Sequence, residues 1–350
     1  MNNPEELLKW LLKNDIKETT HPNGNNNENP VQTLNDILIS HKANCIDIAN
    51  AVHEICKDKE HYLILNRFSI KNKSMGHVYC IYKDKNYYVF RFDPRTNYGE
   101  IKEYICNLNE VIYHEELALK DAFTSLLGKC SPFNSILTEK EMKQWDNLVR
   151  KEVKQKELME LFVDSFTEKI IDFNIYLNTK FDYGKLINDK KIIEFDNFED
   201  YVTISPKDFF KYKIGVCWDF TEFEGTIFSK WMNLTSNKLM NDEFSMYYIE
   251  HKDKQGIYPT HTWLAYNHNN KIYLFESSWL KYQSIRCFLS EEEMINFYSS
   301  KLLYENEKIL DGPFIFKYNL IGKYGLIPDE YMDYIWNNGK LIQYCSINFL

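Results

Sequence analysis

Apolar residues recur at spacings of three and four after Cys45 and again after Cys217, which is the period of a helix with one buried face. They are Ile46, Ala49, Val52 and Cys56 in the first stretch, and Phe220, Phe223, Ile227 and Trp231 in the second. The pattern therefore predicts two helices, each beginning at a cysteine.

Each predicted helix is followed by runs in which aromatic and aliphatic residues alternate with polar ones, as in strands with one buried face. The runs are His61–Ile70, 77–82 and Tyr87–Asp93 in the first half, and 244–250, 261–266 and 272–276 in the second, with polar turns at 84–86 and 267–270. In each half a histidine begins one hairpin strand and an acid ends the next. The order of helix, strand and hairpin occurs twice, which predicts a tandem duplication.

The repeat predicts an α+β protein with two tandem domains, each with the cysteine-bearing helix packed on an antiparallel sheet. We place the first domain at residues 1–130 and the second, with a helical tail, at 157–350. Thr138 and Glu141 have the spacing of a capping box, so residues 131–156 are expected to form a helical connector. The polar segment 21–30 reads as a surface loop.

The 350 residues include 44% apolar and 27% charged side chains, a composition that excludes wholesale disorder. The formal net charge of −9 is the wrong sign for a protein that binds nucleic acid through its phosphates. No apolar run is long enough to span a membrane, and the N-terminus lacks the basic region of a signal peptide. We expect a cytoplasmic protein that binds neither nucleic acid nor membranes.

The eight cysteines are irregularly spaced, with neither a C-x-x-C pair nor a grouping typical of zinc. Reduced thiols are the simplest interpretation. No Walker loop or G-x-G-x-x-G element is present, so we expect no cofactor and no metal.

The positions of Cys217, His261 and Glu276 predict a thiol nucleophile. The start of a helix and a neighbouring imidazolium both lower the pKa of a thiol. Glu276 ends the strand that pairs with the strand of His261, where it can orient the imidazole. The backbone N–H of Cys217 is a candidate oxyanion donor, and the sequence indicates no second one.

Cys45, His77 and Asp93 form the corresponding set in the first half. Ordered Cys-His-acid triples are common by chance, but both sets share Cys-x-Asp, an aromatic residue two positions after the histidine, and a Phe before the acid. The first set is therefore either a second active site or a relic with a packed cysteine. Asp47 and Asp219 lie in the first helical turn, where a structural carboxylate is favoured.

Three tryptophans near the second set, Trp218, Trp263 and Trp279, are candidates for a substrate cleft, although large aromatic residues beside strands more often belong to the core. Cys56 and Cys80 lie on an apolar helical stripe and within a strand, and both are interpreted as structural.

The motifs Gly215-Val-Cys217-Trp-Asp-Phe, Thr-His261-Thr-Trp and Phe-Glu276-Ser-Ser-Trp279 resemble those of the transglutaminase-like superfamily of papain-type thiol enzymes. The similarity is to its bacterial and mobile-element members, and it covers roughly residues 160–290. It implies that Cys217 is the nucleophile, His261 the base and Glu276 the orienting acid, although the superfamily commonly has Asp at the third position. The first half departs further, with Ala43 in place of the glycine and Ile46 in place of the aromatic residue.

The leading hypothesis is an intracellular cysteine-dependent amide hydrolase or acyltransferase, that is, a peptidase, a deamidase or a transglutaminase-like enzyme. It would act on a peptide or protein amide through a thioester on Cys217. The alternative is a catalytically idle tandem-domain protein that binds a peptide or protein partner. A cell-wall amidase of the NlpC/P60 kind is a third interpretation, but it requires an export route that the sequence does not indicate. Nothing in the pattern specifies an oligomeric state.

Overall fold

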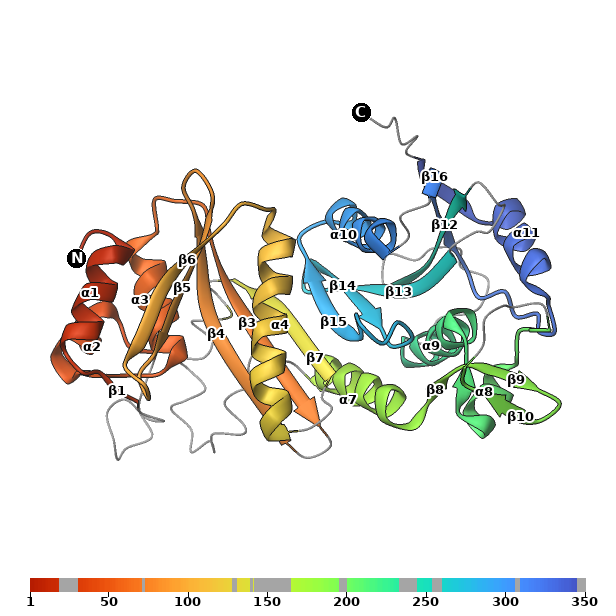
Figure 1. Cartoon of the computed structure of the whole chain (residues 1–350), viewed down its shortest axis with the longest axis horizontal. Helices are drawn as coiled ribbons and strands as arrows, with labels where there is room; N and C mark the ends of the chain where they lie inside the picture. The colour runs from red at the N-terminus through yellow and green to blue at the C-terminus, as the bar shows by residue number, and fades with distance from the viewer. Residues whose placement is uncertain are drawn as a thin grey trace. The chain divides into compact units, whose positions relative to one another are not determined.

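The structure is a computed structural model (Figure 1). It describes residues 1–18, 31–70, 73–127, 131–138, 141, 165–194, 200–232, 244–253, 260–305 and 309–344. Helices and antiparallel strands form two compact units, Met1–Asp172 and Phe173–Leu350. The α+β class predicted from the sequence is confirmed.

The first unit places a helix that starts at Cys45 on an antiparallel sheet. Its helices are α1 (Pro4–Lys13), α2 (Leu34–Ser40), α3 (Cys45–Ile55) and α4 (Leu108–Leu127). Its strands are β1 (Lys17–Glu18), β2 (Lys42–Ala43), β3 (His61–Ile70), β4 (Lys73–Lys83), β5 (Tyr87–Asp93), β6 (Tyr98–Tyr104) and β7 (Ser131–Leu137). The sheet order is β7-β3-β4-β5-β6 with every pair antiparallel, while β1 and β2 form a separate parallel pair.

The elements from α7 onward follow the same plan around Cys217. The helices are α7 (Ser165–Lys180), α8 (Pro206–Tyr212), α9 (Cys217–Trp231), α10 (Glu291–Glu305) and α11 (Pro328–Asn338). The strands are β8 (Asp182–Tyr183), β9 (Lys185–Ile187), β10 (Lys190–Ile192), β11 (Ile214–Gly215), β12 (Phe244–Asp253), β13 (Thr260–His268), β14 (Lys271–Glu276), β15 (Ser284–Phe288), β16 (Ile309–Tyr318) and β17 (Lys340–Tyr344). Here the order is β17-β16-β12-β13-β14-β15, again antiparallel, and β8 and β11 form the short parallel pair.

The two units share more than the predicted helix, strand and hairpin. In each, a short parallel strand pair precedes the cysteine helix, four consecutive strands follow it, and a helix then leads to a strand that returns beside the first of the four. Thus α4 and β7 correspond to α10 and β16. The predicted repeat of elements is confirmed, and the shared order extends it.

The start of each cysteine helix is fixed by a buried aspartate. Asp47 accepts the N–H of Asn44 at 2.9 Å, and Asp219 accepts the N–H of Val216 at 3.0 Å. Each aspartate also accepts an N–H from a preceding segment, that of Gln32 for Asp47 at 2.9 Å and that of Ile204 for Asp219 at 2.9 Å. These bonds satisfy donors at the helix start and tie the preceding loop to it, which is the structural role predicted for both residues.

Asp219→Ala is expected to destabilise the chain by about 3–5 kcal/mol, because two backbone N–H groups and the Tyr201 hydroxyl would lose their buried acceptor. The half-buried Asp208, which accepts the Ser205 hydroxyl at the start of α8, is the control, and its alanine variant should cost about 1 kcal/mol or less. Urea unfolding of both variants measures the difference. Equal losses would show that the Asp219 contacts add nothing beyond an ordinary cap.

Residues 131–137 correct the predicted connector, which was to be helical over 131–156. They form β7, because Phe133, Ile136 and Leu137 are buried and the strand pairs along β3. The predicted capping box is present, since Glu141 accepts the N–H of Thr138 at 2.6 Å and donates its own N–H to the Thr138 hydroxyl at 3.1 Å. Residues 142–156 lie outside the described residues, as do the whole predicted loop at 21–30 and the segment beyond 344.

The predicted turn at 267–270 is shorter than expected. Strand β13 continues to His268, and only Asn269 and Asn270 form the loop, both with positive φ. Two consecutive residues in the left-handed region are typical of a tight hairpin turn, and asparagine tolerates that region better than most residues. The predicted C-terminal helix is present as α11, which ends before Gly339.

Within the ranges given above, no helix is both long and apolar enough to cross a bilayer.

Candidate active site

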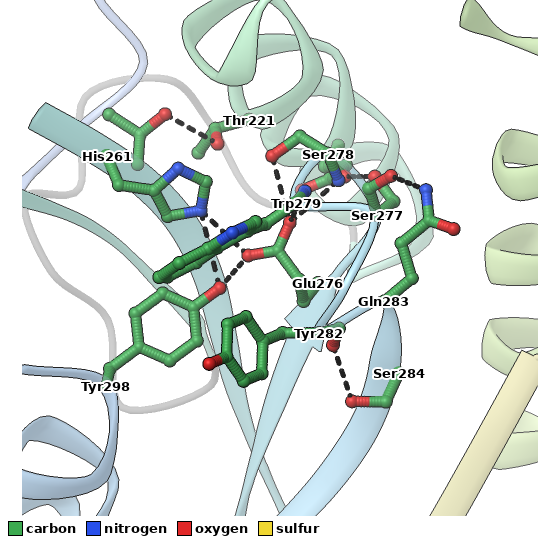
Figure 2. Close-up of polar contacts among 12 residues, drawn as sticks. Thr221, His261, Glu276, Ser277, Ser278, Trp279, Tyr282, Gln283, Ser284 and Tyr298 are labelled. Atoms are coloured by element: carbon green, nitrogen blue, oxygen red, sulfur yellow. Dashed lines mark hydrogen bonds and ion pairs between the residues drawn. The ribbon is translucent and has the colours of Figure 1, made fainter. Parts of the chain in front are cut away.

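Helix α9 packs against β13, and this contact brings the start of the helix to the histidine strand (Figure 1). The hydroxyls of Thr221, one turn after Cys217, and Thr262, the neighbour of His261, are hydrogen bonded at 3.0 Å (Figure 2). Both threonines are buried. This bond fixes the position of the helix along the strand.

The hairpin of β13 and β14 places His261 and Glu276 on the same face. Leu264 pairs with Phe275, and because side chains alternate along strands, His261 and Glu276 both point to the opposite face. His261 Nε2 lies 2.8 Å from Glu276 Oε2. The predicted contact between base and orienting acid is therefore made.

Donors on both sides surround the Glu276 carboxylate, which is 1% exposed. Oε1 accepts the N–H groups of Ser278 and Trp279, each at 2.7 Å, and the Ser278 hydroxyl at 2.9 Å. Oε2 accepts His261 and the hydroxyl of Tyr298, which comes from α10 (Figure 2). These bonds compensate for burial of the charge and hold the carboxylate in one orientation.

Cys217 is the first residue of α9 and is 5% exposed. The Cys217 thiol forms a hydrogen bond with the His261 ring. Because Nε2 of that ring is bound to Glu276, the nitrogen that faces the thiol is Nδ1. Burial by itself lowers the pKa of His261, but the Glu276 charge and the bonds to Cys217 and Glu276 outweigh it and raise that pKa to about 10. The imidazole is therefore held as an imidazolium beside the thiol at neutral pH.

A tyrosine hydroxyl also reaches Cys217. Tyr183 pairs with Gly215 in the short ladder of β8 and β11, two residues before the cysteine. The Tyr183 hydroxyl forms a hydrogen bond with the Cys217 thiol, and it accepts a second hydrogen bond from the Cys217 backbone N–H. In the first unit the same ladder position is held by Glu18, which pairs with Ala43. Tyr183 thus occupies the candidate oxyanion donor in the free protein.

The three candidate tryptophans differ in position. Trp279 and Trp263 lie beside the histidine, with ring centroids 5.1 Å and 6.4 Å from that of His261. Trp218 is instead stacked on Tyr331 with centroids 4.7 Å apart, and it is 4% exposed. Trp218 therefore belongs to the packed interior, and Trp279, which is only partly buried, is the best placed of the three to contact a ligand.

In the first unit, the corresponding residues Cys45, His77 and Asp93 do not form a hydrogen-bonded set in the described structure. The sulfur of Cys45 accepts the backbone N–H of Val78, and burial raises the pKa of its thiol to about 11. Burial also lowers the pKa of His77 to about 4. Among the described residues, no hydrogen bond joins His77 to Cys45 or to Asp93. The pair is therefore a neutral thiol and a neutral imidazole.

Arginines engage the acids of the first unit instead. Asp93 accepts both Nε and Nη2 of Arg95, at 3.0 and 3.1 Å, and these bonds help to hold the pKa of its carboxyl below the ordinary value against burial, which acts to raise it. Glu115 on α4 is paired with Arg91. The Asp93 carboxylate, which could orient His77, is thus bound to the guanidinium of Arg95 instead.

Sequence reasoning missed Tyr298, Tyr183 and the donors at Ser278. One signal was available for Tyr298, because Asp93 and Glu276 are 183 positions apart and the same offset relates Glu115 on α4 to Tyr298 on α10. Cys56 and Cys80 are fully buried, in line with their interpretation as structural. No group of three or more His, Cys, Asp or Glu residues in the described part of the chain is arranged to hold a metal ion.

Comparison with protein-family models, with curated proteins and with solved structures finds no match to the chain.

Proposed function

We propose that this protein is a cysteine-dependent amide hydrolase or acyltransferase of the transglutaminase-like, papain-type kind, and that its second unit carries the active site. The observation that supports this most strongly is the connected set of Cys217, His261 and Glu276. A thiol at the start of a helix, an imidazole bonded to it and a buried acid on the other ring nitrogen are what thiol acyl transfer requires.

In the proposed reaction the Cys217 thiolate attacks the carbonyl carbon of an amide, and the π electron pair moves to the oxygen. His261 then donates its proton to the leaving nitrogen, the C–N bond breaks, and a thioester remains on Cys217. Water or an amine, deprotonated by His261, attacks the thioester, and the C–S bond breaks to release the acyl product and regenerate the Cys217 thiolate beside the imidazolium. Hydrolysis and transfer differ only in this second nucleophile.

The oxyanion of the intermediate would accept a hydrogen bond from the Cys217 N–H. In the free protein this N–H donates to the Tyr183 hydroxyl. A substrate carbonyl must therefore displace the Tyr183 hydroxyl. This favours a substrate that brings enough binding energy to displace that hydroxyl, such as a peptide or protein segment, over a small free amide.

Alkylation by iodoacetamide at pH 7 tests the proposal, with the modified peptides identified by mass spectrometry. We expect Cys217 to be labelled first among the eight cysteines, because it is the thiol bonded to an imidazolium. His261→Gln should slow its labelling about tenfold or more. Cys45, which also begins a helix but has a raised pKa, is the internal control. Slow and uniform labelling would favour the idle binding protein instead.

A further inference from the structure

Tyr298 makes a contact with the catalytic set that its sequence position alone does not reveal. The residue lies on α10 and is fully buried. Its hydroxyl donates to Glu276 Oε2 and lies 3.3 Å from His261 Nε2 (Figure 2). The imidazole N–H and the phenol O–H therefore converge on a single carboxylate oxygen.

We propose that Tyr298 is a positioning residue of this site, whose hydroxyl shares the Glu276 oxygen with His261 and so limits how tightly that carboxylate holds the imidazolium. The inference rests on the proposed function, because it assigns the residue a part in the proton transfers of His261.

The physical reason is competition for one acceptor. A carboxylate oxygen that accepts a second hydrogen bond has less negative charge to offer the first donor. The imidazolium is then a stronger acid and releases its proton to a leaving amine more readily. Without the hydroxyl, Oε2 would have His261 as its only partner among the described contacts, while Oε1 would keep its three donors.

Of the groups around His261, Glu276 is the one whose charge the Tyr298 hydroxyl can affect, because the hydroxyl is hydrogen bonded to it. Cys217 faces the imidazole from α9, and β12 presents the apolar Ile249 as the strand partner. Glu224, also on α9, interacts with the charge of His261, but burial raises the pKa of its carboxyl well above the ordinary value. That shift favours the neutral form of Glu224, and the carboxylate that hydrogen bonds to the ring is that of Glu276.

The first unit supports this assignment by contrast. Glu115 occupies the matching place on α4, and it accepts a hydrogen bond from Tyr104 as well as from Arg91. The shared acceptor thus exists there too, but it binds a guanidinium instead of an imidazole. Only in the second unit, where the cysteine, histidine and acid are hydrogen bonded to one another, does a described tyrosine hydroxyl donate to the acid that binds the histidine.

Tyr298→Phe isolates the hydroxyl, because the ring packs on Trp263, Trp279 and His261 with centroid distances of 4.6, 5.5 and 5.6 Å, and a phenyl ring keeps those contacts. Tyr104→Phe is the matched control, since it removes the same kind of tyrosine-to-glutamate bond in the first unit. Thermal unfolding of both variants checks that each one folds.

The decisive measurement is the pH titration of the His261 ring by ¹⁵N NMR, with its signal assigned by its absence from His261→Gln. In Tyr298→Phe we expect the pKa of His261 to rise by about half a pH unit or more, and turnover at pH 7 to fall about tenfold with little change in KM. Tyr104→Phe should move neither. An unchanged His261 titration in Tyr298→Phe overturns the proposal whatever happens to the rate. The titration needs no substrate, so it remains a test of Tyr298 even if Cys217 shows no selective reactivity and the proposed function fails.

Discussion

Cys217→Ala is expected to lower turnover of an activated acyl substrate, such as a p-nitrophenyl ester, by about a thousandfold or more, because no other thiol in the described structure is bonded to an imidazolium. Cys45→Ala is expected to keep most of the activity. Its thiol has a raised pKa and faces the Val78 N–H instead of His77. Release of nitrophenolate, followed for both variants on one substrate, measures the difference.

The pair of variants separates three possibilities. Loss only in Cys217→Ala supports a single working site in the second unit. Equal losses would show that the units act together, and loss only in Cys45→Ala would place the enzyme in the first unit. Cys56→Ala controls for the removal of a buried thiol, since Cys56 is fully buried at the end of α3 and should affect stability more than rate.

The sequence predicted the main elements of the site because they depend on short-range patterns. The apolar spacing after Cys45 and Cys217 placed both helix starts at the residues where the structure has them. Alternation along 261–266 and 272–276 located the hairpin, and a hairpin register fixes which side chains share a face. The contact between His261 and Glu276 follows from these local features alone.

Contacts that come from distant elements could not be read in this way. Tyr298 reaches the acid from α10, and Tyr183 reaches the cysteine from the two-residue strand β8, which is too short to show any periodicity. The helical expectation for residues 131–137 was wrong for a related reason. The segment becomes a strand only because β3 offers an edge to pair with, and tertiary pairing overrides local propensity.

The contrast between the units was also beyond the sequence pattern. Cys45, His77 and Asp93 keep the order of the second set and nearly its spacing from histidine to acid, yet Asp93 is bound by Arg95, two residues further along. Ser278 holds the position two residues after Glu276, where its N–H and hydroxyl support the acid without competing for His261. Arg95 is therefore one of the differences between the joined set and the unjoined one.

Glu276→Gln is expected to lower turnover by about a hundredfold to ten-thousandfold with little change in shape. The amide oxygen can still accept the N–H groups of Ser278 and Trp279, but this orientation turns the amide NH₂ toward His261 Nε2 and the Tyr298 hydroxyl. The imidazolium loses its counter-charge, and burial then lowers the pKa of His261 from about 10.

The sign of this change can be measured. In the wild type, the imidazolium needed by the leaving amine persists until the pH approaches 10, so kcat/KM should fall only toward that value. In Glu276→Gln the alkaline limb should move to lower pH, because the pKa of His261 falls when its counter-charge is removed. Glu250→Gln is the matched control, because Glu250 is a buried acid of β12 that accepts hydrogen bonds from Tyr248 and Trp336 instead of His261. It should change stability and leave the pH profile in place. An alkaline limb that stays near pH 10 in Glu276→Gln would show that Glu276 does not hold the imidazolium, and the acid of this site would have to be sought elsewhere.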